Sequence, residues 1–101
     1  MPAPITPTDE NFRSLNATET TYNITAPTVV KAGPGIIATV SIVVAGAAGT
    51  INDCATTGEA TAANTIAALP AAVGIMPLRW PVTAGITVVP GAGQVVAISY
   101  S

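Results

Sequence analysis

The sequence predicts an all-β protein: an antiparallel β-sandwich or jelly-roll-like domain of about six to seven short strands, preceded by an extended N-terminal arm. Apolar and polar residues alternate with a period of two over several short runs, as they do in half-buried strands. Glycine and proline separate these runs. Of the residues, 50% are hydrophobic but only 4% aromatic, so alanine, valine and isoleucine supply a thin, pleated core.

Residues 1–19 are expected to form the arm and residues 20–101 the sandwich domain. The arm contains three prolines and little periodicity, which favours an extended chain. We expect Phe12, Arg13 and Leu15 to anchor it as interface residues, on its own domain or on a neighbouring subunit. A frayed terminus is the alternative that the sequence leaves open. The arm lacks the basic and then apolar pattern of a secretory signal, so none is expected.

The first predicted strand starts at Thr20, with Tyr22, Ile24 and Ala26 on one face and polar residues on the other. Pro27 interrupts it, and residues 28–31 resume as a short edge strand. Residues 32–35 then read Ala-Gly-Pro-Gly, which is turn chemistry.

Residues 32–51 form one uncharged stretch, and this stretch is long enough for a transmembrane helix. Within this stretch, however, positions 36 to 45 alternate between an apolar face and a more polar face, which favours a strand with one buried side. Residues 46–49 are then expected to be a hairpin connection into a strand over 50–54.

The pattern is less regular in the second half. Residues 59–69 are rich in alanine and predict a short helix or turn with Thr57 as its cap, or else a surface loop. Residues 73–80 contain proline and predict an irregular or edge strand. Residues 85–89 and 94–100 are expected to pair as a hairpin through the turn 90–93. In the final strand Val96, Ile98 and Tyr100 share one face.

Few residues suggest chemistry. The chain has no histidine and a single cysteine, Cys54, which we expect to be buried and structural. Asp53 and Glu59 could act as an acid/base pair by spacing, but a solvated loop is the favoured interpretation. No metal or cofactor pattern is present, and the three cations lie too far apart to follow a phosphate backbone. We therefore predict no enzyme, no catalytic, cofactor-binding or metal site, and no nucleic-acid partner.

The predicted surface is short of charge. Only 8% of the residues are charged, against about 25% in an ordinary soluble domain. Monomeric β-proteins use surface charges to keep their exposed edges and faces from associating with neighbouring molecules. Because this chain has few charges, we expect other subunits to cover much of its surface. Trp80, between Arg79 and Pro81, is either a plug of the core or an exposed interface anchor.

Three stretches support a resemblance: TYNITAPTVVKAGPG, GTINDCATTGEA and WPVTAGITVVPGAGQVVAISYS. Together they span about residues 20–101, and the sequence resembles small β-rich virion proteins of tailed bacteriophages, such as capsid decoration or cement proteins and fibre-base proteins. The resemblance implies a homotrimer that binds the lattice of the major capsid protein on the virion surface after assembly in the host cytoplasm. It also implies an arm that reaches an adjacent subunit.

Three alternatives remain at this stage. A tail or fibre component belongs to the same class. A small membrane protein such as a holin would use residues 32–51 and 60–78 as two spans, although Pro70 and Pro77 disfavour the second, and our preferred interpretation involves no membrane. A lectin-like binding module depends only on Trp80.

Overall fold

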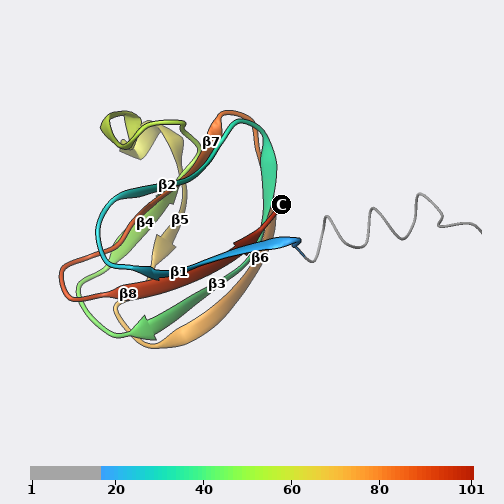
Figure 1. Ribbon diagram of the computed structural model, residues 1–101. Coiled ribbons are helices and arrows are strands. Elements are labelled where there is room, and N and C mark those ends of the chain that lie inside the picture. The colour runs from blue at the N-terminus through green and yellow to red at the C-terminus, as the bar shows by residue number, and fades with distance from the viewer. Residues whose placement is uncertain (1–16) are drawn as a thin grey trace, which may run out of the picture.

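The computed structural model describes residues 17–101, which form two four-stranded antiparallel sheets packed as a sandwich (Figure 1). The strands are β1 (Glu19–Ile24), β2 (Thr28–Ala32), β3 (Gly35–Val44), β4 (Gly49–Asn52), β5 (Thr65–Leu69), β6 (Gly74–Val82), β7 (Gly85–Val89) and β8 (Val95–Tyr100). Sheet A has the order β1-β8-β3-β6, and sheet B has the order β2-β7-β4-β5. The all-β prediction is confirmed, with eight strands instead of six or seven.

The strand pairing follows a simple rule. Strands at equal distances from the two ends of the domain pair with each other: β1 with β8, β2 with β7, β3 with β6 and β4 with β5. Two further pairings, β3 with β8 and β4 with β7, complete the two sheets. This is a long antiparallel ribbon rolled up once, which is the topology of an eight-stranded jelly roll.

The predicted hairpins are wrong. β3 lies in sheet A and β4 in sheet B, so residues 46–49 cross between the sheets. The connection from β7 to β8 also crosses, as does the turn at residues 33–34 between β2 and β3. A short glycine-rich connection can join stacked sheets about 10 Å apart as well as neighbouring strands about 5 Å apart, so turn residues alone do not reveal the partner. In the described part of the chain, β4 and β5 are the only consecutive strands that pair with each other.

The core lies between the two sheets. Val96, Ile98 and Tyr100 of β8 face inward, as the alternation predicted, and Val95, Ala97 and Ser99 lie on the opposite face. The side chains packed with them come from both sheets: Ile24, Ile37, Val40, Ile42, Ile51, Leu69, Val82, Ile86 and Val88. Each fully buried side chain of this size contributes about 1.5–3 kcal/mol through removal of its apolar surface from water.

Two β-bulges change which residues face the core. In β1 the register shifts between Thr21 and Ile24, and Asn23 adopts a left-handed φ of 55°. The extra residue reverses the alternation, so that Ile24 is buried while Tyr22 points to solvent with 72% of its surface exposed. The prediction that Tyr22 and Ile24 share a face is therefore wrong. A bulge between Ile37 and Thr39 of β3 likewise adds Ile37 to the core.

The segment between β4 and β5 is not the predicted helix. It forms two single 3₁₀ turns, Thr57–Glu59 and Ala62–Asn64, and then continues as β5. The Asn64 side chain accepts a hydrogen bond from the Thr61 backbone at 3.1 Å and donates one to the Glu59 carbonyl at 2.6 Å. These bonds satisfy the backbone in a tight loop, and pairing with β4 outweighs the helix propensity of the alanines.

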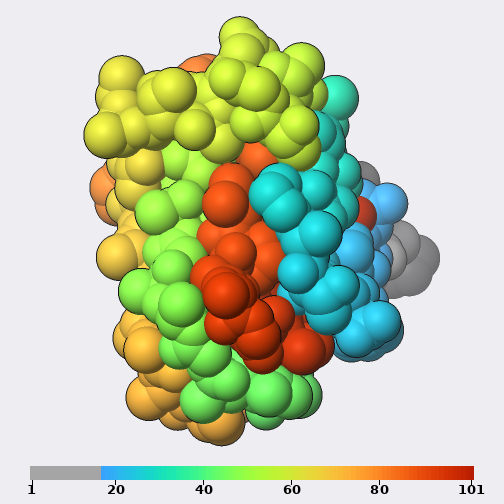
Figure 2. Space-filling view, turned by 90° about the vertical axis from the view of Figure 1, so that its left-hand side faces the viewer, coloured from blue at the N-terminus to red at the C-terminus, as the bar shows by residue number. Residues whose placement is uncertain are grey.

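At one end of the sandwich three connections pack together, where red, green and orange segments meet in Figure 2. Ala47 donates its backbone N–H to the Ala92 carbonyl at 2.9 Å, and Gly46 donates to the Ala71 carbonyl at 3.2 Å. Gly91 lies so close to Ala47 that an added Cβ would overlap the Ala47 carbonyl. The end of the sandwich is thus closed by backbone contacts between loops.

The two segments that a membrane protein would use as helical spans are strands and turns in the structure. Residues 32–51 contain β3 and most of β4, and residues 60–78 contain β5 and part of β6. No helix within residues 17–101 is long and apolar enough to cross a membrane.

Candidate functional site: the outer face of sheet A

The large apolar side chains left in solvent gather on sheet A. Five of them belong to its strands: Tyr22, Val43, Val44, Ile75 and Trp80, with Tyr22 and Ile75 each 72% exposed. Val73 directly precedes β6, whereas the strands of sheet B contribute Val29 alone. An apolar surface concentrated on one sheet is typical of a binding face.

The strand register arranges this face in rows across the four strands. In one row Ala97 of β8 pairs with Ser41 of β3, and Ser41 pairs with Ile75 of β6. Tyr22, at the bulge of β1, lies opposite Ala97 at the other end of the same row. The neighbouring row is Thr20, Ser99, Thr39 and Pro77. We call these eight residues the outer face of sheet A.

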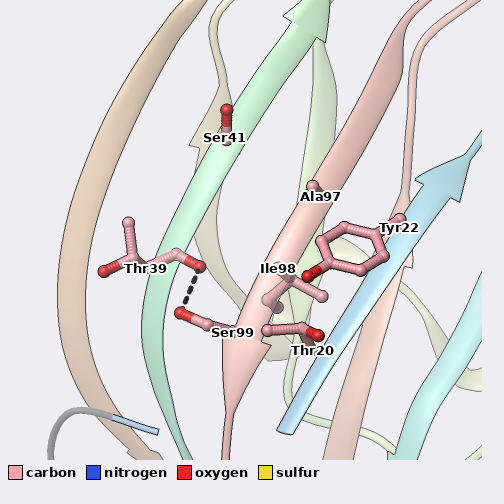
Figure 3. Close-up of a pocket in the computed structure, with 7 residues that line it drawn as sticks. All are labelled: Thr20, Tyr22, Thr39, Ser41, Ala97, Ile98 and Ser99. Carbon is pink, nitrogen blue, oxygen red and sulfur yellow. Dashed lines mark hydrogen bonds between the residues drawn. The ribbon is translucent and has the colours of Figure 1, made fainter.

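A shallow hollow of about 130 Å³ lies in this face (Figure 3). Its lining comes from β1, β8 and β3, and the Tyr22 ring lies across the space between β1 and β8. The lining residues are Thr20, Tyr22, Thr39, Ser41, Ala97, Ile98 and Ser99. The Ser99 hydroxyl donates to the Thr39 carbonyl at 3.4 Å, a long and therefore weak hydrogen bond. The surface of the hollow is almost wholly apolar and has no charge, although several of its lining residues carry hydroxyl groups.

Charged residues lie at the margins of sheet A. Within residues 17–101, its strands contain two of them, Glu19 in β1 and Arg79 in β6. Both side chains are exposed, and neither forms an ion pair with another described residue. The centre of the face therefore offers a partner apolar contact and hydroxyl groups without the cost of desolvating a charge.

Asp53 holds a loop in place. Its carboxylate accepts hydrogen bonds from the backbone N–H groups of Thr83, Ala84 and Gly85, the shortest at 2.8 Å from Ala84. Burial alone would raise the pKa of Asp53, but these backbone donors outweigh it and lower the pKa below its usual value of 3.8. The ionised carboxylate thus anchors the connection between β6 and β7.

The other residues considered for chemistry have structural partners as well. The Glu59 carboxylate accepts a hydrogen bond from the Thr56 hydroxyl at 2.9 Å. Cys54 is buried, with 3% of its surface exposed, and its thiol donates to the Thr56 carbonyl at 3.3 Å, which confirms the predicted buried cysteine. Within residues 17–101, no three acidic, cysteine or histidine side chains are grouped as a metal site would require.

The predicted interface residues divide into two groups. Phe12, Arg13 and Leu15 lie outside the described residues. Trp80 lies on β6, an edge strand as predicted, opposite Ile37 and with half of its surface exposed. Arg79 beside it has a left-handed φ of 49°, which is unfavourable for a residue with a Cβ. That Trp80 anchors an interface stays a prediction.

Sequence reasoning missed Tyr22 and Ile75 as members of one surface. The signal for Tyr22 was Asn23, because asparagine tolerates the left-handed backbone that a bulge needs. The strand order was required to place Ile75 in the row of Tyr22.

Comparisons of the chain with protein-family models, with curated proteins and with solved structures give no match.

Proposed function

We propose that this protein is a non-enzymatic structural component of a tailed-bacteriophage virion that binds and stabilises the capsid as a head decoration or cement protein. The observation that carries the proposal is the outer face of sheet A, which lacks charge and ends in the exposed side chains of Tyr22 and Ile75. Such a face is suited to permanent coverage by other subunits more than to contact with water. The jelly-roll topology is also used by viral capsid domains, although lectins and cupins share it.

The proposed mechanism is adhesion. The protein binds the lattice of the major capsid protein at the virion surface, after assembly in the host cytoplasm, and spreads contact area across the joints between capsid subunits. As a homotrimer it presents three weak sites on one rigid body, so the second and third contacts form at a high effective concentration. No nucleic acid, membrane or cofactor takes part in this mechanism.

The test is to locate the chain in particles. An antibody against the recombinant protein is used for immunogold labelling of purified virions from the phage that encodes it. We expect label over the heads. Label confined to the tail would support the alternative of a tail or fibre component, and unlabelled virions would refute both.

The hollow supports a second candidate function, binding of a neutral saccharide. An exposed aromatic ring such as Tyr22 can cover the apolar side of a sugar, which suits a hollow whose surface is almost wholly apolar. This modifies the lectin-like alternative, because the ring is Tyr22 and not Trp80. Titration of the protein with neutral oligosaccharides, followed by tyrosine NMR signals, tests it; signals that stay unchanged would exclude this candidate.

A further inference from the structure

Within residues 17–101, the two edge strands of sheet A carry different side chains. β1 and β6 lie at opposite edges of the sheet (Figure 1). The β1 edge presents an acid, Glu19, and an aromatic ring, Tyr22. The β6 edge presents a base, Arg79, together with the apolar side chains of Ile75 and Trp80. The acid of the β1 edge is therefore complementary to the base of the β6 edge, and both edges carry exposed apolar side chains that can pack together.

The register places the complementary groups at the same height along the strands. Glu19 pairs with Tyr100, Tyr100 pairs with Ile37, and Ile37 pairs with Trp80, the neighbour of Arg79. This row runs from Glu19 at one edge to Trp80 at the other, and Arg79 lies next to Trp80, in the stretch of β6 where the register shifts. The row through Ser41 has Tyr22 at the β1 edge and Ile75 at the β6 edge. The first row is on the side of the sheet that Tyr100 and Ile37 turn to the core, and the second row is on the outer face, so the two matches lie on opposite sides of the same joint.

We propose that copies of this chain associate side by side, with the β1 edge of one copy against the β6 edge of the next. Glu19 then meets Arg79, and Tyr22 meets Ile75, across the same joint. Because β1 and β6 run antiparallel to each other, a neighbour placed beside the sheet needs no shift along the strands to make both matches. This contact rests on the proposed function, in which the protein is a homotrimer, and it would be the interface between the subunits of that trimer.

This contact joins two different edges, so it is heterologous. A heterologous contact whose rotation closes around an axis gives a ring of identical joints, as the homotrimer of the proposed function requires. A two-fold contact between two β1 edges would bring together the acids, and one between two β6 edges would leave Arg79 without a carboxylate. The charges thus favour a ring over a two-fold dimer.

The joint is made by side chains and not by a continued β-ladder. Pro77 and Pro81 lie in β6 and have no backbone N–H, so this edge makes a poor ladder partner for another strand. The same prolines disfavour fibres in which the strands of successive molecules form one continuous hydrogen-bonded sheet.

The experiment uses residues 1–101 as wild type and as Glu19→Arg, Arg79→Glu and the double variant with both changes. Sedimentation equilibrium measures the dissociation constant of the assembly. Each single variant places like charges at every joint, and we expect the dissociation constant to rise about tenfold. The double variant exchanges the two charges and should return close to the wild-type value. Circular dichroism and thermal unfolding establish that every variant is folded.

Glu59→Arg is the matched control, because it makes the same change of charge as Glu19→Arg in the loop between β4 and β5 and should leave assembly unchanged. Tyr22→Ser tests the apolar half of the joint and should weaken assembly whatever the salt concentration. A wild-type protein that stays monomeric, single variants that assemble like wild type, or a double variant as weak as the singles would each overturn the proposal. Virion labelling does not depend on this measurement, so failure of the joint and failure of the virion assignment can be told apart.

Discussion

Gln94 is the polar side chain on which the closed end of the sandwich depends. It is 1% exposed and belongs to the connection from β7 to β8, where its side chain bonds to the connection from β5 to β6. Its amide N–H donates to the Pro70 carbonyl at 2.8 Å, and its amide oxygen accepts from the Gly91 backbone N–H at 3.1 Å. Gln94→Leu keeps a side chain of similar size but removes both hydrogen bonds.

The cost follows from the two backbone groups left behind. A buried donor or acceptor without a partner costs about 1–3 kcal/mol. The Pro70 carbonyl and the Gly91 N–H are only partly buried, so together they cost about 2–4 kcal/mol. The more apolar leucine returns about 1 kcal/mol. We therefore expect the free energy of unfolding to fall by about 1–3 kcal/mol, which lowers Tm by about 5–20 °C for a domain of this size.

Urea unfolding followed by Trp80 fluorescence and by circular dichroism measures this loss. Agreement between the two probes checks that unfolding is two-state. Ala92→Ser, an exposed change in the same connection, serves as control and should stay within about 0.5 kcal/mol of wild type. If Gln94→Leu costs less than about 1 kcal/mol, water or rearranged backbone satisfies these groups and the reasoning is wrong.

Three further predictions concern the loops and the bulge. The ionised form of Asp53 is favoured in the folded state, so its stabilisation is complete above about pH 5 and is lost as the pH falls through the lowered pKa; Asp53→Asn should flatten the stability curve in this acidic range, and an unchanged curve would contradict the role of the carboxylate. Gly91→Ala should destabilise the fold by about 1–3 kcal/mol in thermal unfolding because its methyl group overlaps Ala47, whereas Gly58→Ala, where the space is open, is the control. Asn23→Val should cost about 1–2 kcal/mol because a β-branched residue is strained at φ 55°, while Asn23→Gly should cost less than half as much; equal losses in denaturant unfolding would argue against the bulge.

The sequence predicted local structure well wherever one face of a strand is buried. The alternation of Val96, Ile98 and Tyr100 was sufficient to orient β8, because each inward position is apolar. Proline was sufficient to place β6 at an edge, because it cannot donate to a second neighbour. These are short-range consequences of backbone and side-chain chemistry.

Strand partners and the candidate site depend on long-range contacts that the pattern does not contain. β1 pairs with β8 across almost the whole domain, and nothing in either run specifies the other. Tyr22 was assigned to the same face as Ile24 because the alternation was read through Asn23 without a bulge. β5 was missed because alanine suits both a helix and a thin strand, and pairing with β4 decided between them.

The position of β8 inside sheet A affects how the protein can fold as the ribosome makes it. β1 is the first of the eight strands to be synthesised, yet its one neighbour within residues 17–101 is β8, whose residues emerge last. Until Tyr100 has left the exit tunnel, β1 stays an unpaired strand and β3 lacks one of its two neighbours. Nascent chains arrested before residue 95 should therefore be open to proteases and to chaperones, and the domain should become resistant only after the final strand is released.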